Sequence, residues 1–261
     1  MTVFTLASSS AGNCCLVSHG NTHILIDAGI SLRRIREGLR GAGLTPDDLD
    51  CVLVTHDHID HVSGLNILVK YHKTPVFSSF GTGAGICRSM PETEPYLNFC
   101  ETGTELGIGD IAIQSFSTPH DAPGSVGYTL EAGGKKMVYV TDLGRLTDEV
   151  VLASCGADIA VIEANHDLDM LENGPYPRFL KDRILSGHGH LANNDCGRLA
   201  AILADSGARY ILLGHLSREN NTPGIARDTV MYALFDEGFS VGEDVELDVA
   251  PPYTPGRIYT L

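Results

Sequence analysis

The chain has 261 residues, 43% of them hydrophobic and 20% charged, which is enough to bury a substantial core and too apolar for a disordered chain. A mean hydropathy of +0.03 and the lack of an apolar stretch of about 20 residues argue against a membrane protein. The net charge of −15 excludes a protein that coats a nucleic-acid duplex with a broad basic surface.

The cysteines and the start of the chain indicate a cytoplasmic protein. The seven cysteines are an odd number and lack the spacing of a zinc finger or a disulfide framework. The first residues contain no basic segment and resemble a strand rather than a signal peptide. Because no low-complexity linker, long charge run or solenoid repeat interrupts the sequence, we expect a single domain over residues 1–261.

Short apolar runs bounded by turn residues predict strands throughout the chain. Helical spacing of apolar residues follows His61 and recurs in Asp195–Ser206 and after Pro223. Since the early strands form hairpin-like clusters and the later ones alternate with helices, we expect an α/β sandwich of sheets covered by helices. The predicted strands are Val3–Leu6, His23–Ile26, Cys51–Val54, Ile111–Ser115, Lys136–Val140, Ile159–Ile162 and Tyr210–Leu213.

Four arginines form a basic cluster in this otherwise acidic chain: Arg33, Arg34, Arg36 and Arg40. They have two interpretations. They are either the solvated face of a helix or a local contact for phosphate groups.

The most informative segment is a His-x-His-x-Asp-His run directly after a predicted strand and at the start of a predicted helix. It places four metal-ligand side chains, His56, His58, Asp60 and His61, within six residues. Imidazole and carboxylate ligands suit zinc, manganese or iron(II). The segment therefore predicts a metal site.

Four ligands on one loop cannot surround two ions, so remote ligands are expected. His120, Asp142 and His215 each lie just beyond a predicted strand. Alone, each could be a hydrogen-bonded surface residue; together with the loop they would supply five imidazoles and two carboxylates at one rim. Asp27 ends another predicted strand, as either a turn residue or an acceptor that orients a ligand imidazole.

The order of these residues resembles the metallo-β-lactamase fold superfamily over essentially the whole chain. Within it, the sequence is similar to the YycJ (WalJ) type. The motifs that carry this likeness are Ala7-Ser-Ser-Ser-Ala-Gly-Asn-Cys14, Glu163-Ala-Asn-His166, Gly187-His-Gly-His-Leu191 with Asn194-Asp-Cys-Gly197, and Gly214-His-Leu-Ser-Arg-Glu-Asn-Asn221.

The resemblance implies a four-layer αββα sandwich with two divalent metal ions (Zn, Mn or Fe). One ion would be held by His56, His58 and His120, and the other by Asp60, His61 and His215. Asp142 would bridge the two ions. The resemblance also implies a 5′→3′ exonuclease that acts on DNA.

Two features of the sequence narrow the choice among branches of this superfamily. About seventy residues separate Asp142 from His215, too few for the extra domain that β-CASP nucleases insert at this point. The bridging position is also an Asp, whereas class B β-lactamases place a Cys at the equivalent position. Both features disfavour those branches and favour the phosphodiesterases and thioesterases.

We therefore predict metal-assisted hydrolysis of a phosphodiester. Two cations would lower the pKa of a bridging water and supply hydroxide at neutral pH, held in place by Asp60 and Asp142. His188, His190 and His166 are candidates for protonating the leaving group. Polar turns often bind phosphate, so Asn13, Asn165 and the Ser8–Ser10 loop are candidates for substrate contact, and His166 is a further one.

Two other functions fit the same residues. A thioester or lactone hydrolase of the glyoxalase II type could use the same seven ligands, and the acidic charge of −15 favours it. A metal-dependent regulatory partner with little catalysis is the second alternative, although a full ligand set is unusual for such a protein.

Overall fold

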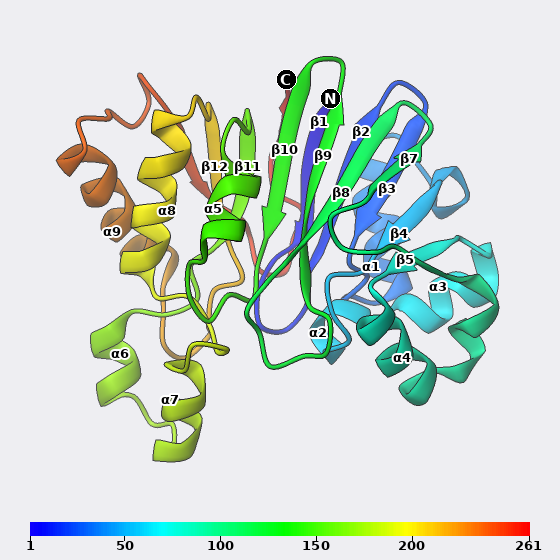
Figure 1. Cartoon of the computed structure of the whole chain (residues 1–261), viewed down its shortest axis with the longest axis horizontal. Helices are drawn as coiled ribbons and strands as arrows, with labels where there is room; N and C mark the ends of the chain where they lie inside the picture. Colours follow the sequence, from blue (N-terminus) through cyan, green and yellow to red (C-terminus); the bar gives the residue numbers. More distant parts are fainter.

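Fourteen strands form two seven-stranded mixed sheets that pack face to face, with helices on both outer surfaces (Figure 1). The computed structural model describes residues 1–261. This arrangement confirms the predicted αββα sandwich. All seven predicted strands are present, each within two residues of its expected bounds. No helix combines the length and apolar character needed to cross a membrane.

The two sheets share one plan, in which an antiparallel part continues into a run of parallel strands. The first sheet is antiparallel from β14 to β3 and parallel from β3 to β6. Its strand order is β14 (Ile258–Thr260), β1 (Thr2–Ala7), β2 (Cys14–His19), β3 (Thr22–Ile26), β4 (Cys51–Leu53), β5 (Val76–Ser78) and β6 (Leu97–Phe99).

The second sheet is antiparallel from β7 to β10 and parallel from β10 to β13. Because the interior strand β11 is covered on both faces, every residue of that strand is buried. The strand order is β13 (Glu246–Val249), β12 (Tyr210–Gly214), β11 (Ile159–Glu163), β10 (Lys135–Val140), β9 (Val126–Ala132), β8 (Ile111–Ser117) and β7 (Glu105–Ile108).

Helices cover the outer face of each sheet, and the short α6 and α7 extend to one side (Figure 1). The first sheet carries α1 (Leu32–Gly41), α2 (Ile59–Val62), α3 (Leu65–His72) and α4 (Phe80–Ser89) with two 3₁₀ turns, Pro46–Asp48 and Pro91–Tyr96. The second carries α5 (Asp148–Ser154), α6 (Leu168–Asn173), α7 (Arg178–Ile184), α8 (Asn193–Asp205) and α9 (Pro223–Asp236).

The single helix predicted after His61 is in fact two helices, α2 and α3. Gly64 separates them, because its N–H donates to Ala28 O rather than continuing a helical ladder. A Cβ at this position would lie 2.0 Å from Ile30 O. The close packing against the segment after β3 therefore ends α2 after one turn.

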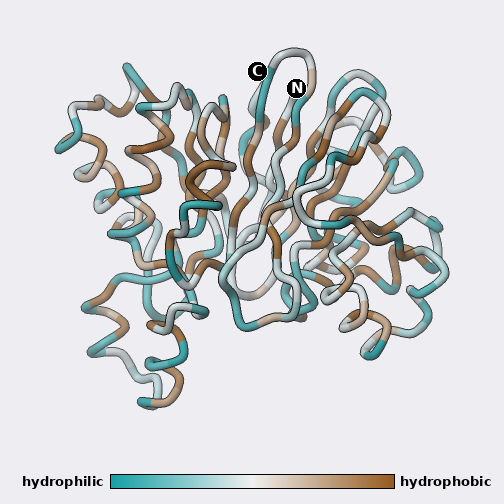
Figure 2. The backbone as a smooth tube through the Cα atoms, viewed as in Figure 1, coloured by the Kyte–Doolittle hydropathy of each residue, from teal (hydrophilic) through white to brown (hydrophobic).

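Three hydrophobic clusters hold the layers together. The middle cluster draws residues from both sheets, including Ile24 and Leu53 of the first and Tyr128 and Val161 of the second. The outer clusters pack each sheet against its helices. Hydrophobic residues accordingly follow the central strands and hydrophilic residues the outer loops (Figure 2). Burial of this apolar surface is the main favourable term in folding.

One hydrogen bond between the sheets holds the end of β4, where the predicted metal-binding loop begins. Tyr128 of β9 is fully buried, and its hydroxyl donates to Val54 O at 2.8 Å. The next residue, Thr55, accepts a bond at its carbonyl from Val126 N at 3.0 Å. These bonds fix the start of the loop against the opposite sheet.

We expect Tyr128→Phe to lower the free energy of unfolding by about 1–2 kcal/mol, because Val54 O loses its buried donor. Denaturant titration measures this change. Tyr232→Phe, at an exposed tyrosine of α9, is the matched control and should leave stability unchanged. Equal stability of the two variants would contradict the role given to this bond.

Candidate metal centre

The side chains of the His-x-His-x-Asp-His run converge where β4 passes into α2. His58 is the N-cap of α2 with an extended backbone (φ −66°, ψ 148°), and Asp60 and His61 lie in the single turn that follows. His56 and His61 are fully buried, while His58 and Asp60 are partly open to solvent. The change from extended chain to helix turns all four side chains toward one region.

Three remote residues at strand ends adopt the left-handed backbone conformation. Their φ values are +61° at Asp27, +61° at Asp142 and +54° at His215. This conformation is uncommon and strained for residues other than glycine, and such strain concentrates at functional sites. Here it turns each side chain from the end of its strand toward the rim between the sheets.

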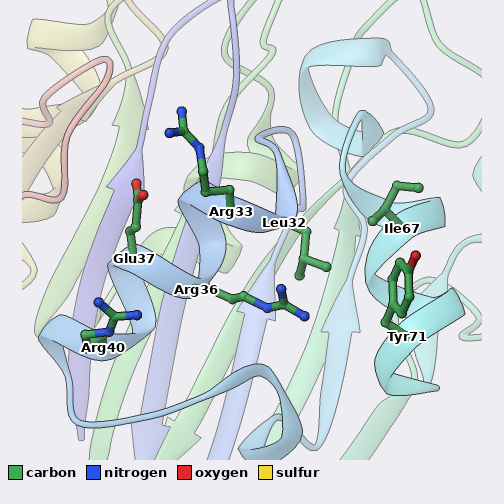
Figure 3. Close-up of a pocket in the computed structure, with 7 residues that line it drawn as sticks. All are labelled: Leu32, Arg33, Arg36, Glu37, Arg40, Ile67 and Tyr71. Atoms are coloured by element: carbon green, nitrogen blue, oxygen red, sulfur yellow. The ribbon is translucent and has the colours of Figure 1, made fainter.

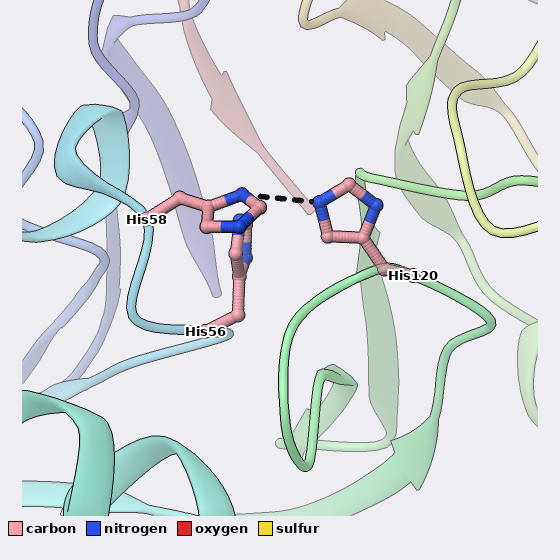
Figure 4. A group of neighbouring side chains, drawn as sticks. All are labelled: His56, His58 and His120. Carbon is pink, nitrogen blue, oxygen red and sulfur yellow. Dashed lines mark hydrogen bonds between the residues drawn. The ribbon is translucent and has the colours of Figure 1, made fainter. Parts of the chain in front are cut away.

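The first group consists of His56, His58 and His120, whose ring nitrogens lie within 4.8 Å of one another. Figure 4 shows the imidazoles of His58 and His120 facing each other across a dashed contact, Nδ1 to Nε2, of 3.2 Å. His120 reaches this position from the loop after β8, and its own Nδ1 lies 3.1 Å from Gly189 O.

The second group consists of Asp60, His61 and His215. His215 Nε2 lies 3.2 Å from Asp60 Oδ2. Asp142 lies between the two groups, with Oδ2 at 3.2 Å from His61 Nε2 and Oδ1 at 3.8 Å from His120 Nε2. All seven residues predicted as ligands therefore lie in neighbouring clusters, and their coordination of metal stays a prediction.

The chemistry of these atoms fits divalent ions. His56 Nε2 and Asp142 Oδ2 are buried and have no hydrogen-bond partner in the protein, although buried polar atoms are normally paired. Both belong to one cluster of ligand-type atoms with His61. An ion held among nitrogen and oxygen donors would satisfy both atoms, as expected of zinc, manganese or iron(II).

Burial lowers the pKa of the imidazoles, and nearby carboxylates raise it. Burial lowers the pKa of His56 and of His120, which favours the neutral form that binds metal. Burial also opposes protonation of His61, but the carboxylates of Asp27 and Asp142 outweigh it and raise the pKa of His61. Together, the buried carboxylates supply negative charge that a cation would neutralise.

Asp27 contacts the Nδ1 side of the His61 imidazole. It is fully buried, and its Oδ2 lies 2.7 Å from His61 Nδ1 while its Oδ1 accepts from Thr55 N at 2.9 Å. Burial raises the pKa of Asp27, and the His61 partner opposes this. A carboxylate at Nδ1 fixes the imidazole so that Nε2 faces the cluster, as in many metal sites.

Glu163 is a central residue of the site to which the sequence assigned no role. It is fully buried at the end of β11, and its Oε1 lies 2.8 Å from His215 Nδ1 and 2.9 Å from His190 Nδ1. Its Oε2 accepts from Leu143 N and Leu191 N. Burial alone would raise the pKa of Glu163, but the two histidines outweigh it and lower the pKa to about 2. Its position directly after a predicted strand, like that of Asp142, was the available signal.

The structure separates the three histidines that were candidates for proton transfer. His190 lies within the site, with its ring centroid 5.3 Å from that of His120 and its Nδ1 3.5 Å from Asp142 Oδ1. His188 is exposed on the neighbouring turn and lies outside the clusters. His166 is buried without a partner on either ring nitrogen, and burial lowers its pKa to about 4.

The two asparagines predicted to contact substrate are buried beside the histidines. Asn13 Nδ2 lies 3.1 Å from His61 Nε2, and Asn165 Nδ2 donates to His215 O at 3.0 Å. Asn13 N also donates to Asp60 O at 2.8 Å. Both are placed to support the cluster, and their contact with substrate stays a prediction, as does that of His166.

Gly29 allows the ligand turn to approach the segment after β3. A Cβ there would lie 1.7 Å from Asp60 O. The Gly29 N–H also donates to Asn13 O at 2.8 Å. The loop after β1, the segment after β3 and the turn of α2 are therefore in direct backbone contact.

Comparison with known proteins agrees with this geometry. Residues 22–216 match the family model described as "Beta-lactamase superfamily domain". The chain belongs to the metallo-β-lactamase superfamily. It is 34% identical over 256 residues to exodeoxyribonuclease YycJ of Bacillus anthracis, covering 97% of this chain and 96% of that protein. Exodeoxyribonuclease WalJ of Streptococcus pneumoniae is also 34% identical, with 95% and 96% covered.

Solved structures share the fold across the whole chain. The metallo-β-lactamase fold protein YhfI of Bacillus subtilis superposes with a TM-score of 0.73 at 18% identity, covering 99% of this chain and 98% of its own. Zn²⁺-bound PqqB of Methylobacterium extorquens gives 0.73 at 19% identity with full coverage of both chains. The chain is thus a metallo-β-lactamase-fold hydrolase with His, Asp and Glu clusters typical of a dinuclear metal site.

We expect Zn²⁺ or Mn²⁺ to raise the melting temperature of chelator-treated protein by about 5–10 °C when the free ion concentration is about a hundred times the Kd of the protein for that ion. The shift arises because the ion binds only the folded state. Differential scanning calorimetry measures this shift. Asp142→Asn should largely abolish it, whereas Asp205→Asn, at an exposed position on α8, should keep it. An undiminished shift in Asp142→Asn would place the ion elsewhere.

Proposed function

We propose that this hydrolase is a dinuclear metal-dependent phosphodiesterase that degrades DNA from the 5′ end. The observation that carries the proposal is the position of Asp142, a buried carboxylate in contact with both histidine groups. The names of the YycJ and WalJ relatives, which cover nearly the full chain, support DNA as the substrate.

In this proposal His56, His58 and His120 would hold one ion and Asp60, His61 and His215 would hold the other. Asp142 lies between the two groups and would serve both. When bound, a pair of divalent ions supplies an activated water and neutralises charge on the phosphoryl oxygens. Asp60 and Asp142 orient the reacting groups between the histidine clusters.

Proton delivery to the leaving group falls to His190. Its Nδ1 is held by Glu163 Oε1 at 2.9 Å, which leaves Nε2 free to carry the transferred proton. Burial lowers the pKa of His190, but the Glu163 charge outweighs it and raises the pKa. His188 is exposed and outside the clusters, so it is the weaker candidate.

The arginines of α1 support a phosphate-rich substrate. Arg33, Arg36 and Arg40 line a groove of about 450 Å³ between α1 and α3, together with Glu37 and the exposed Tyr71. Figure 3 shows Arg36 reaching from α1 toward Tyr71 on α3. No carboxylate lies within ion-pair distance of these guanidinium groups, although Arg36 Nη2 lies 3.0 Å from His72 Nε2. Basic side chains beside an exposed aromatic ring are typical of surfaces that bind single-stranded DNA.

The two helices that flank the groove start beside the ligand turn. α1 and α3 both start close to the ligand turn, where Gly64 N donates to Ala28 O and Ser63 Oγ donates to Gly29 O. A DNA strand whose terminal bond lies at the metal centre could continue along this groove. We therefore propose that the arginine cluster contacts phosphate groups and is not merely the solvated face of a helix.

A thioester or lactone hydrolase remains the second candidate because the same ligand set attacks a carbonyl as readily as a phosphorus atom. The net charge of −15 favours a small neutral or weakly charged substrate. Parallel assays with a hydroxyacyl-glutathione thioester and with single-stranded DNA distinguish the two activities. We expect turnover of the DNA alone.

We expect the purified chain supplied with Mn²⁺ to shorten 5′-phosphorylated DNA from that end, and Asp142→Asn to reduce the rate by about three orders of magnitude. Gel analysis of oligonucleotides labelled at either end measures both polarity and rate. Circular dichroism establishes that the variant is folded. Full nuclease activity in Asp142→Asn would reveal a contaminant or a wrong site.

We expect joint replacement of Arg33, Arg36 and Arg40 by Gln to weaken binding of single-stranded DNA. Each lost phosphate contact reduces the slope of log K against log salt by about 0.7, so the three together should reduce it by about 2. Fluorescence anisotropy at several salt concentrations measures the slope. Replacing Arg198, an exposed arginine of α8, should leave the slope unchanged; a wild-type slope in the triple variant would refute the groove's role.

A further inference from the structure

A small pocket lies beside the metal centre, separate from the groove on α1. Its volume is about 230 Å³, and it is lined by the loop after β1, the segment after β12 and the loop between β13 and β14. No Asp or Glu lines it, although the chain contains 33 acidic residues. The absence of carboxylates makes it suited to a ligand that carries negative charge.

The pocket is lined by residues that adjoin the proposed ligand His215 in the chain. Leu216, Ser217 and Arg218 follow this residue directly and form one wall. The opposite wall includes Ser8, whose Oγ accepts a bond from His215 N at 2.9 Å. A group bound in the pocket would therefore lie beside the segment that carries the proposed ligand His215.

Two buried hydroxyls in the pocket wall have a proton to donate. Ser9 Oγ accepts from Ala11 N at 3.2 Å, and Ser217 Oγ accepts from Asn220 N at 3.2 Å. Neither hydroxyl donates to an acceptor of the protein. Buried donors are normally used, so an acceptor supplied by a ligand would complete both sites.

The mouth of the pocket pairs a cation with an aromatic ring. The Arg218 guanidinium lies 5.7 Å from the Tyr253 ring centroid, and both side chains are exposed. Arg218 makes no ion pair within the protein. Arg34 of α1 donates to Tyr253 O at 3.0 Å, which holds this loop in place.

We propose that this pocket binds one nucleotide of the DNA strand, with its base against Tyr253 and its phosphate on Arg218 and the hydroxyls of Ser9 and Ser217. Aromatic faces accept any base, and arginine and hydroxyl donors suit phosphate oxygens. The inference rests on the proposed function for the source of the nucleotide, a DNA strand, and it gives that function a site that positions the strand beside the metal centre.

Binding of a mononucleotide tests the pocket independently of cleavage. The probe is the 5′-monophosphate of 2-aminopurine deoxyriboside, which has no phosphodiester bond and whose fluorescence falls when its base stacks. It is titrated with the full-length chain, first in EDTA and then with Zn²⁺. We expect quenching by the wild type and by Tyr253→Phe, loss of quenching in Tyr253→Ala, and about tenfold weaker binding in Arg218→Gln.

The matched control is Tyr232→Ala, which removes an exposed tyrosine of α9 away from this pocket. It should behave as the wild type. Equal quenching and affinity in wild type, Tyr253→Ala and Arg218→Gln would overturn the proposal, and so would the absence of any binding to the wild type.

Steady-state kinetics then distinguishes a strand site from a site for free nucleotide. We expect Tyr253→Ala and Arg218→Gln to raise KM for single-stranded DNA about tenfold, whereas Tyr232→Ala should leave it at the wild-type value. An unchanged KM for DNA despite weaker mononucleotide binding would overturn the strand site. If the wild type binds the probe through Tyr253 but cleaves no DNA, the proposed nuclease function fails while the nucleotide pocket stands.

Discussion

The arrangement depends on three carboxylates that are buried at strand ends and matched by imidazoles. Asp27, Asp142 and Glu163 are each almost inaccessible to water, and each lies within 3.2 Å of a histidine nitrogen. An isolated charge in such surroundings would be very costly, so these groups are stable only as partners. Asp27 and Glu163 fix imidazoles at Nδ1 and leave Nε2 facing the cluster, whereas Asp142 meets His61 at Nε2 within the cluster. The buried carboxylate–imidazole contacts therefore stabilise the strand ends and also orient the imidazoles.

The two-sheet sandwich brings ligand-type residues from two sheets to one rim. Parallel strands in both sheets end at one rim, so the His56–His61 turn from the first sheet meets His120, Asp142 and His215 from the second. The left-handed residues turn the side chains across the gap, and the Tyr128–Val54 bond holds the two sheets in register there. The surrounding loops then determine what can reach the rim, with arginines on one side and the Arg218–Tyr253 pocket next to His215.

Much of this could be predicted from the sequence, because strands with apolar runs and the polar residues that end them are visible locally. The predicted strands and sandwich are present, and the predicted ligands converge. Glu163 was assigned no role because its partners, His190 and His215, are distant in sequence. The break at Gly64 and the separation of His188 from His190 depend on packing against other segments. The pocket is formed by three loops, and no local pattern encodes their contact.

The direct backbone contact between Gly29 and the carbonyl of Asp60 has a consequence for how such a centre can vary. A methyl group at residue 29 would move the α2 turn as a rigid unit, since it is also tied to Asn13 and Ala28. The placement of the ligand-type side chains in this turn therefore depends on a residue that is not itself one of them. A substitution at Gly29 would displace the ligand turn and keep every ligand-type side chain, whereas a substitution at one of the histidines would remove one.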